Sequence, residues 1–490
     1  MLQNLMLGFS ALASLKAITS LMVGILLGYT VGCIPGISAS IGIALLLPFT
    51  FGMEPVPALC MLVAVYMASE YGGAIPAILV NVPGVPGAAA AAFDGYPMTQ
   101  RGEAGKALTL SILGSGAGSF LSTIFLILTA QVMADVALAF GPAEYFALAV
   151  LGLSLIVTLS TGSLLKAMIG LLFGLVLTAI GVDPLTGDNR YVVVRGLLDG
   201  IPFVPALIGL FALAEVFFML EIANQPQPKM PTKLSLWSSL GVLNPHWGNV
   251  FRSSVIGYII GVIPGAGAAI ASFAAYACEK RLNKGPIPFG EGNPDGVVAS
   301  ETANNAVVCG ALAPMLALGV PGSASAAILI GGLMIHGLQP GPLLFTNSPQ
   351  VPYSIFASLL IGLPIMVVLG LAGARLWVLV TLIPRGVVAT MVGALCLTGA
   401  YASDNDEFSV AVAVAFGVIG YLLRKVDIQP APIVLALVLG EMMEINLRRG
   451  LISGNNSLMF FLSSPISGSL LVVAALLLFV SLFTRKRAVA

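Results

Sequence analysis

The feature that most constrains this chain is a helix-breaking sequence in the middle of a long apolar stretch. Residues 301–345 are apolar enough to lie in a membrane, yet they contain Gly319-Val320-Pro321-Gly322-Ser323. In hydrocarbon, a backbone N–H or C=O freed from its helix finds no water, so such a break persists only where it is buried in protein or lines a cavity. The break is therefore expected to mark a functional site.

The break has a counterpart in the first half of the chain. Tyr71 to Gly84 aligns without a gap with Cys309 to Gly322, at an offset of 238 positions. A second kind of break, Gly32-Cys33-Ile34-Pro35-Gly36, recurs 229 positions later as Gly261-Val262-Ile263-Pro264-Gly265. Interrupted apolar segments at corresponding places in two halves are typical of the substrate site of a secondary transporter.

Composition places these breaks in a membrane protein. The 490 residues are 58% hydrophobic and 9% charged, whereas soluble domains are about 25% charged. Apolar runs of roughly 17–25 residues recur along the chain and suit spanning helices, while a transmembrane barrel would show alternating segments of about ten. The net charge is zero, so nothing favours nucleic acid as a partner. We predict an all-α polytopic membrane protein, with broken helices and re-entrant hairpins arranged as an inverted repeat.

The apolar runs suggest five units. They are an interfacial N-terminal helix at 1–18, a first repeat at 19–223, a linker at 224–248, a second repeat at 249–450, and a C-terminal helix with a basic tail at 451–490. Each repeat is expected to hold a hairpin, a broken helix and four further helices. The arms of the first hairpin are expected to be near fifteen residues each, too short to span alone, although a single bent crossing remains an alternative. The polar stretch 94–106 is expected to be a loop.

Charge placement indicates that the second repeat is inverted relative to the first. Short loops rich in Lys and Arg stay on the cytoplasmic side. The loop 279–284 is basic while its first-half counterpart 51–57 is not, and the next pair of loops, 101–106 and 346–352, differs in the opposite sense. Arg448 and Arg449 do not fit this pattern. The basic C-terminal tail is expected to be cytoplasmic.

The breaks also suggest how an anion is held with few cationic side chains. Each break would expose the N-terminus of a half-helix, whose free N–H groups and positive dipole end attract a carboxylate. The candidate substrate-binding residues are Gly36, Ser38, Asn81, Gly84, Gly265, Gly267, Asn304, Asn305, Gly322, Ser323 and Ser325. The alternatives are that the breaks are simple kinks and that the Asn and Ser side chains hydrogen-bond neighbouring helices.

Two substitutions would distinguish these interpretations. If half-helix termini bind the substrate, aspartate at Asn305 or Ser323 should impair uptake more than alanine does, because it adds a negative charge. A methyl group at Gly322 should crowd an approaching carboxylate and oppose any positive φ that the break requires.

Two acidic residues beside the broken segments are candidates for binding a coupling cation. Glu70 and Glu301 are rare intramembrane or boundary acids, and such acids are usually functional. A boundary or helix-capping role is the alternative for Glu301.

Other chemistries lack their residues in this sequence. No G-x-x-x-x-G-K-[ST] motif occurs, and five scattered cysteines with two histidines offer neither a zinc site nor a disulfide framework. We predict no cofactor, with Na⁺ or H⁺ as co-substrate. An intramembrane protease would need a nucleophile with a base, or two aspartates, at membrane depth. The chain has no G-x-G-D, so we predict that it is not an enzyme.

The paired breaks and several turns resemble those of the TctA family, the large membrane subunit of tripartite tricarboxylate transporters. The matching segments cover nearly the full length. They include residues 32–36 with Leu45-Leu46-Leu47-Pro48, residues 71–73, 81–84 and 94–98, and, in the second half, residues 261–265, 279–281, 301–305, 319–323 and 336–342. The chain departs at an alanine run, 88–92, where more Ser and Thr are expected, and at Ala74 and Pro76.

The resemblance implies a subunit of the bacterial inner membrane that imports carboxylates by ion coupling. Its implied partners are a small membrane subunit of about four helices and a periplasmic solute-binding protein. The particular carboxylate, the choice of Na⁺ or H⁺ and the oligomeric state are left open by the sequence. A passive channel or permease for small anions is the alternative function.

Overall fold

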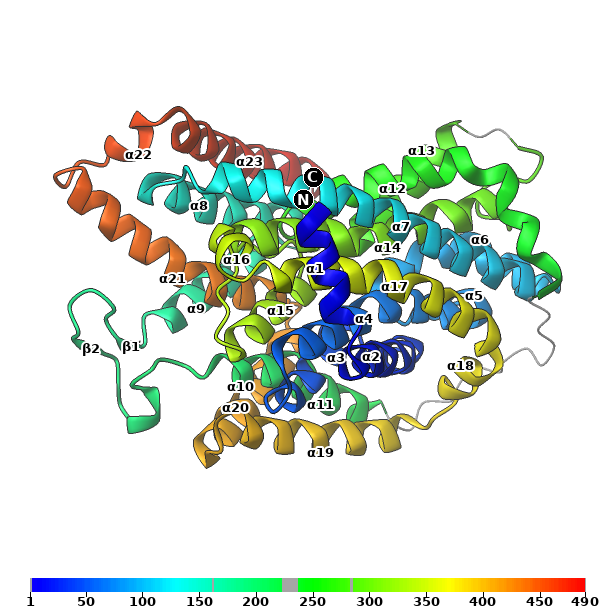
Figure 1. Cartoon of the computed structure of the whole chain (residues 1–490), viewed down its shortest axis with the longest axis horizontal. Coiled ribbons are helices and arrows are strands. Elements are labelled where there is room, and N and C mark those ends of the chain that lie inside the picture. Colours follow the sequence, from blue (N-terminus) through cyan, green and yellow to red (C-terminus); the bar gives the residue numbers. More distant parts are fainter. Residues whose placement is uncertain (1, 161–162, 223–236, 283–284, 490) are drawn as a thin grey trace.

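The computed structural model describes residues 2–160, 163–222, 237–282 and 285–489, and these residues are almost entirely helical (Figure 1). Nine helices in this part of the chain are long and apolar enough to cross a membrane. The only strands among the described residues are β1 (Gly181–Val182) and β2 (Asn189–Arg190), which pair antiparallel. The prediction of an all-α polytopic membrane protein is confirmed.

The described helices are divided between the two halves of the chain as follows. The first half contains α1 (Leu2–Leu12), α2 (Leu15–Cys33), α3 (Ala39–Leu46), α4 (Pro55–Gly72), α5 (Ala74–Val80), α6 (Ala89–Gln100), α7 (Ala104–Ala137), α8 (Pro142–Leu159), α9 (Leu164–Thr178), α10 (Phe203–Leu207) and α11 (Ala214–Glu221). The second contains α12 (Trp247–Val262), α13 (Gly267–Leu282), α14 (Pro294–Leu318), α15 (Ala324–Ile335), α16 (Pro342–Asn347), α17 (Gln350–Ala372), α18 (Ala374–Val380), α19 (Arg385–Asp404), α20 (Glu407–Lys425), α21 (Pro430–Ser453), α22 (Phe460–Ser463) and α23 (Pro465–Val489). A π-helical segment, Ile208–Leu213, joins α10 to α11, and single 3-10 turns cover Leu47–Thr50, Pro86–Ala88 and Arg195–Leu197.

The centre of the molecule is formed by α14, which leads into the second VPG break, and by α4, which is followed by α5 and the first VPG break. Almost every residue of α4 and α14 is buried, and α14 packs along α7 and α12 while α4 packs along α2. In Figure 1, α4, α14 and α17 run through the middle, α19 runs along the lower edge and α21 to α23 lie at the left. Most of α4 is apolar, and a helix that is apolar on all sides is expected to be buried on all sides. Helix α14 carries polar residues, Glu301 and Asn304 among them, and it is buried because α7, α12 and α13 pack around it.

The helices before the two VPG breaks end in the same way. Asn81 follows α5 with φ 58°, and Gly319, its counterpart 238 positions later, follows α14 with φ 72°. In both copies the next amide donates to a carbonyl six residues back, at 3.3 and 3.2 Å. This is the left-handed cap that commonly ends helices and satisfies their last carbonyls. Asn81 therefore has a conformational role as a helix cap, and its side chain is exposed.

The glycines of the breaks also make corresponding contacts. A Cβ on Gly84 would lie 2.1 Å from the carbonyl oxygen of Gly32, and a Cβ on Gly322 would lie 2.4 Å from that of Gly261. Gly84 and Gly322 differ by 238 positions, and Gly32 and Gly261 by 229, which are the two offsets found in the sequence. In each half, the glycine of the VPG break thus packs against the backbone of the other break in the same way.

The first hairpin differs from its predicted dimensions. Its first arm, α2, has 19 residues rather than about fifteen, because the side chain of Ser14 caps the helix by accepting from the amide of Ala17. The second arm, α3, has 8 residues. By length, α2 is a candidate span and α3 is not. The predicted surface helix at 1–18 is correspondingly shorter: α1 ends at Leu12, and it packs on α17, where Gly8 faces the carbonyl of Tyr353.

The predicted loop 94–106 was wrong over most of its length. Asp94 lies within α6, and its carboxylate accepts from the backbone amides of Gly290, Gly292 and Asn293 at 2.7–2.9 Å, and from the hydroxyl of Tyr276 at 2.8 Å. These bonds come from a distant segment that the local sequence does not reveal. They satisfy a buried carboxylate that would otherwise have to remain in water.

Much of the predicted linker, residues 224–236, lies outside the described residues. Its remaining part begins a 3-10 helix, Trp237–His246, that leads directly into α12. The backbone of the basic tail continues α23.

Candidate functional site

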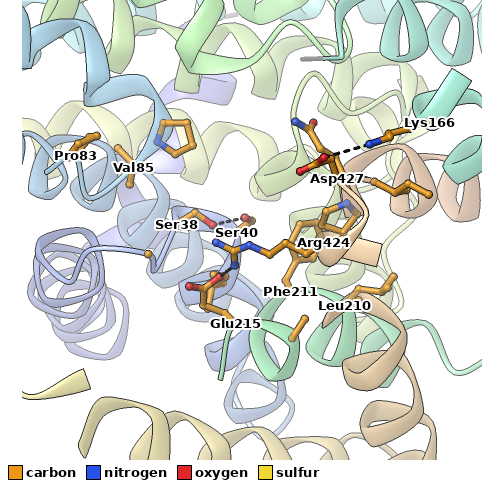
Figure 2. Close-up of a pocket in the computed structure, with 18 of the residues that line it drawn as sticks. Ser38, Ser40, Pro83, Val85, Lys166, Leu210, Phe211, Glu215, Arg424 and Asp427 are labelled. Atoms are coloured by element: carbon orange, nitrogen blue, oxygen red, sulfur yellow. Dashed lines mark hydrogen bonds and ion pairs between the residues drawn. The ribbon is translucent and has the colours of Figure 1, made fainter. Parts of the chain in front are cut away.

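A cavity of about 870 Å³ opens where the two breaks of the first half meet the helices α9, α11 and α20 (Figure 2). Among its lining residues are three of the predicted substrate-binding positions, Gly36, Ser38 and Gly84. Pockets for small ligands typically measure about 300–1,000 Å³, so the cavity has the size of a metabolite site. It is therefore a candidate binding site.

The N-terminus of α3 faces this cavity. Ser38 is the N-cap residue, but its hydroxyl does not cap the helix; it lies 2.7 Å from the hydroxyl of Ser40. Ser38, Ser40 and Ile41 all line the cavity. The first N–H groups of a helix have no partner within the helix, so α3 presents uncapped donors and the positive end of its dipole to a ligand.

Two cationic side chains also line the cavity, and the sequence argument missed both. Arg424, at the end of α20, bonds the carboxylate of Glu215 on α11, and its guanidinium lies 3.9 Å from the ring centroid of Phe218. Lys166, in α9, lies 3.1 Å from Asp427. Figure 2 shows Arg424 reaching toward Ser38 and Ser40. A lone Lys inside the apolar run 164–178 was the signal that could have identified one of them.

The second-half glycines do not line this cavity. Gly265 has φ 81° and packs on α8, where an added Cβ would lie 2.7 Å from Cα of Ile156, while Gly267, with φ 66°, begins α13 with open space beside it. Gly322 is packed against backbone, and the positive φ of its break belongs to Gly319. The structure therefore does not place these three glycines with Gly36 and Gly84.

The serines after the second VPG break have local partners. Ser323 is the N-cap of α15, since its hydroxyl accepts from the amide of Ala326 at 3.1 Å, and it also lies 2.8 Å from the hydroxyl of Tyr66. Ser325 is buried in the first turn of α15. For Ser323, capping of α15 and a contact with Tyr66 of α4 account for both of these hydrogen bonds.

The predicted coupling residues lie in a polar cluster between α4, α7 and α14. The carboxylate of Glu301 accepts from Ser111 at 3.2 Å, and the amide of Asn305 donates to Ser115 at 2.8 Å. The amide of Asn304 donates to the backbone carbonyl of Glu70 at 3.1 Å. Glu301 and both asparagines are fully buried, and Glu70 is 7% exposed.

Four oxygens of this cluster have no hydrogen-bond partner. They are Glu70 Oε2, Glu301 Oε1, Asn304 Oδ1 and Asn305 Oδ1. Buried polar atoms are normally paired, and each exception needs an explanation such as a bound ion. Carboxylate and amide oxygens are the ligands that hard cations prefer, so the cluster could hold a cation or a proton.

The helix-capping alternative for Glu301 was wrong. The N-cap of α14 is Asn293, whose side chain accepts from the amide of Asp295. Glu301 lies two turns further along, with none of its surface exposed. It therefore does not cap α14.

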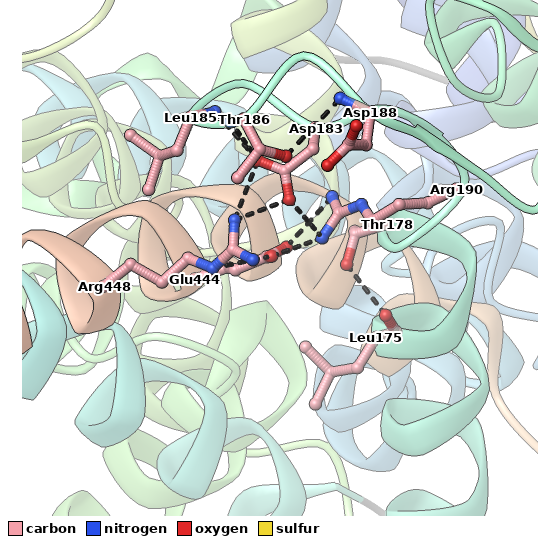
Figure 3. Close-up of polar contacts among 9 residues, drawn as sticks. All are labelled: Leu175, Thr178, Asp183, Leu185, Thr186, Asp188, Arg190, Glu444 and Arg448. Atoms are coloured by element: carbon pink, nitrogen blue, oxygen red, sulfur yellow. Dashed lines mark hydrogen bonds and ion pairs between the residues drawn. The ribbon is translucent and has the colours of Figure 1, made fainter.

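A second group of charged side chains holds the β1–β2 loop on α21 (Figure 3). Asp183 pairs with Arg448 at 2.6 Å, and Arg190 pairs with Glu444 at 2.5 Å. Backbone amides of Leu185 and Thr186, together with Arg448, hold the pKa of Asp183 well below its usual range. Arg448, which does not fit the charge pattern of the loops, is thus bonded to a specific carboxylate. These residues fix a loop rather than line the cavity.

Broken helices at the centre of a bundle of membrane-length helices, with a cavity where the breaks meet cationic side chains, define a polytopic membrane transporter. The chain belongs to the tripartite tricarboxylate transporter TctA family, whose family model matches residues 18–435. It is therefore a component of a tripartite transporter, and the family is not one of enzymes.

Two relatives come from Agrobacterium vitis. An "uncharacterized 52.8 kDa protein in TAR-I ttuC' 3'region" is 38% identical over 474 residues, which cover 96% of this chain and 94% of that protein. An "uncharacterized protein in TAR-II ttuC' 3'region" is 37% identical over 215 residues, which cover 44% of this chain and 89% of that protein. No solved structure matches the chain.

Proposed function

We propose that this protein is the large permease subunit that imports carboxylates, driven by an ion gradient. It would work in the bacterial inner membrane with a small membrane subunit of about four helices and a periplasmic solute-binding protein, its C-terminus in the cytoplasm. The observation that carries the proposal is the cavity in which Arg424 and Lys166 face the N-terminus of α3. This cavity combines three kinds of group that attract a carboxylate.

The substrate would be held by both side chains and backbone. A guanidinium binds a carboxylate through charge-assisted hydrogen bonds, and the free amides of α3 add donors that need no buried cation. A unit charge pair 4 Å apart at an effective dielectric constant near 20 is worth about 4 kcal/mol. Lys166 and Arg424 are both partly exposed, at 39% and 43%, so solvent would weaken the attraction of both cations for the substrate.

Coupling would occur at the cluster of Glu70 and Glu301. Their unpaired oxygens, with those of Asn304 and Asn305, support the binding of Na⁺ or H⁺. The matched breaks support a pair of repeats, and the charge pattern of the loops supports opposite orientations for the two repeats. Transport would then occur by alternating access, in which one group of helices moves against the other.

The cavity is tested by citrate binding to detergent-purified protein. Lys166→Gln and Arg424→Gln should each weaken binding, the arginine variant by at least about tenfold, since about 1.4 kcal/mol corresponds to a factor of ten. Lys425→Gln is the matched control, because Lys425 follows Arg424 on α20 but pairs with Glu221 and does not line the cavity. A thermal melt confirms folding of each variant. Unchanged citrate binding by folded Lys166 and Arg424 variants would show that the substrate is bound elsewhere.

The alternative function is a passive channel or permease for small anions. It predicts flux without saturation and without dependence on a cation gradient or a binding protein. Uptake into proteoliposomes with a Na⁺ or a proton gradient imposed alone decides between the two functions and identifies the ion.

A further inference from the structure

A carboxylate of the protein itself occupies the cationic part of the cavity. Glu215 lies in α11 with its side chain 8% exposed, and its Oε2 bonds Arg424. Its other oxygen faces the first hairpin break, where a Cβ on Gly36 would lie 2.8 Å from Oε1. Gly36 has φ 97°, a conformation that favours glycine. The hairpin break thus leaves room for this carboxylate beside the guanidinium.

We propose that Glu215 is a tethered competitor of the substrate, which a substrate carboxylate replaces at Arg424 as Glu215 takes up a proton. This inference rests on the proposed function, since it assumes that the cavity binds carboxylates. It assigns Glu215 a role in binding specificity and in proton coupling that is distinct from the Glu70 and Glu301 cluster.

The exchange conserves the charge around Arg424. Without substrate, the guanidinium and the Glu215 carboxylate sum to zero. With substrate, the incoming carboxylate pairs with Arg424, and one proton taken up from the bulk solvent, carried there by hydronium or a buffer acid, neutralises Glu215, so the sum is again zero. Two carboxylates at this one cation would instead leave an uncompensated negative charge beside the buried Glu215, which favours protonation of one of them. The only covalent changes are the O–H bond formed on Glu215 and the bond to hydrogen broken in the proton donor.

The packing around Arg424 favours exchange over simultaneous binding. One face of the guanidinium is covered by the ring of Phe218, which limits the positions from which a second carboxylate can approach. The other cation of the cavity differs, because the partner of Lys166 is Asp427, whose side chain is 88% exposed. An exposed pair of this kind is worth about 0–1 kcal/mol, so Lys166 can turn to a substrate without leaving a buried carboxylate unpaired.

Few charged groups near Glu215 compete with it as the titrating group. Arg424 faces it from α20, and Lys166 and Asp427 line the far side of the same cavity. The segment 34–38 contributes no titratable side chain, and its only polar side chain is that of Ser38. On the other side of α11, Gly393 of α19 faces Val216. The next carboxylate on α11, Glu221, pairs with Lys425 and does not line the cavity.

The test compares Glu215→Gln with Glu221→Gln, which removes a carboxylate from an ion pair between the same two helices. Citrate affinity of purified protein is measured by calorimetry between about pH 5 and 8, with acetate as a monocarboxylate comparison. At about pH 8, we expect Glu215→Gln to bind citrate about tenfold more tightly than the wild type does, which is in the range of typical coupling factors. The citrate affinity of the wild type should fall as the pH rises, and the affinity of Glu215→Gln should not show this fall. Glu221→Gln should behave as the wild type.

Proton uptake provides a second readout that a purely structural role would not change. When citrate is added in weak buffer with a pH indicator, the wild type should take up one more proton per citrate bound than Glu215→Gln does. The protonation of citrate itself cancels in this difference. Equal proton uptake, or equal pH dependence of affinity, in the two proteins would overturn the inference.

The outcomes also separate this inference from the proposed function. If Arg424→Gln abolishes citrate binding while Glu215→Gln leaves its pH dependence unchanged, the cavity binds substrate and Glu215 is only structural. If neither Arg424→Gln nor Lys166→Gln affects binding, the cavity is not the substrate site and both proposals fail.

Discussion

Replacing Gly322 with alanine would place a methyl group 2.4 Å from the carbonyl oxygen of Gly261 and 2.7 Å from Cα of Ala311. The optimal separation of non-bonded heavy atoms is about 3.5–4.0 Å. The VPG break and the backbone that it contacts must therefore separate by on the order of 1 Å. Both contacts are backbone atoms, which cannot move aside as a side chain would. Overpacking of this kind costs about 1–3 kcal/mol. We therefore expect Gly322→Ala to lower the melting temperature and uptake together.

The assay is a thermal melt of detergent-purified protein alongside citrate uptake into proteoliposomes. Gly386→Ala is the matched control, because Gly386 lies in α19 with no heavy atom within 4 Å of an added Cβ and with an ordinary φ. It should melt like the wild type or slightly higher. If Gly322→Ala melted normally but lost transport, the methyl group would be crowding the substrate rather than a helix contact, and the packing argument would be refuted.

Three further predictions use other parts of the structure. Ser323→Ala should lower the melting temperature, since losing an N-cap costs about 1 kcal/mol, whereas Ser323→Asp retains a capping acceptor and should melt higher than the alanine variant; a greater loss of citrate affinity in the aspartate variant would instead support a substrate contact. Glu301→Gln should abolish the dependence of uptake on the cation gradient while leaving citrate affinity within about threefold, a change smaller than the usual range of coupling between sites, and normal gradient dependence would remove Glu301 from the coupling site. Asp183→Asn should loosen the β1–β2 loop, measured as faster hydrogen exchange of residues 181–190. Because the folded pKa of Asp183 lies below its unfolded value, its contribution to stability is present above about pH 4 and is lost only as the pH falls toward the folded pKa; protection that fell already between pH 7 and 5 would contradict this assignment.

The sequence by itself determined the class of fold and the positions of the breaks. Long apolar runs require helices in a membrane because backbone groups there must be paired within the segment. The sequence Val-Pro-Gly interrupts such a run whatever surrounds it, since proline lacks a donor and glycine tolerates unusual backbone angles. The matched ends of α5 and α14, at Asn81 and Gly319, follow from these local rules.

Only the tertiary structure decided which predicted site residues come together. Gly36, Ser38 and Gly84 share a cavity, while Gly322 supports a helix contact and Ser323 caps α15. The local sequence around a glycine at a break is the same whether the space beside its Cα holds a ligand or the backbone of a neighbouring helix. The difference depends on which helix packs beside it, and that is a contact between residues far apart in the chain.

The cationic side chains of the cavity illustrate the same limit. Lys166 and Arg424 come from α9 and α20, more than 250 positions apart, and Glu215 comes from a third helix. From sequence alone, an arginine at the end of an apolar helix is interpreted as a boundary residue in contact with water or lipid headgroups. The sequence specified that each of these charges lies within or beside an apolar helix. The packing of α9, α11 and α20 around the first-half breaks decided that the charges meet in one cavity. The physical reason is that charge attraction and burial act between residues that only the folded chain brings within a few ångströms of each other.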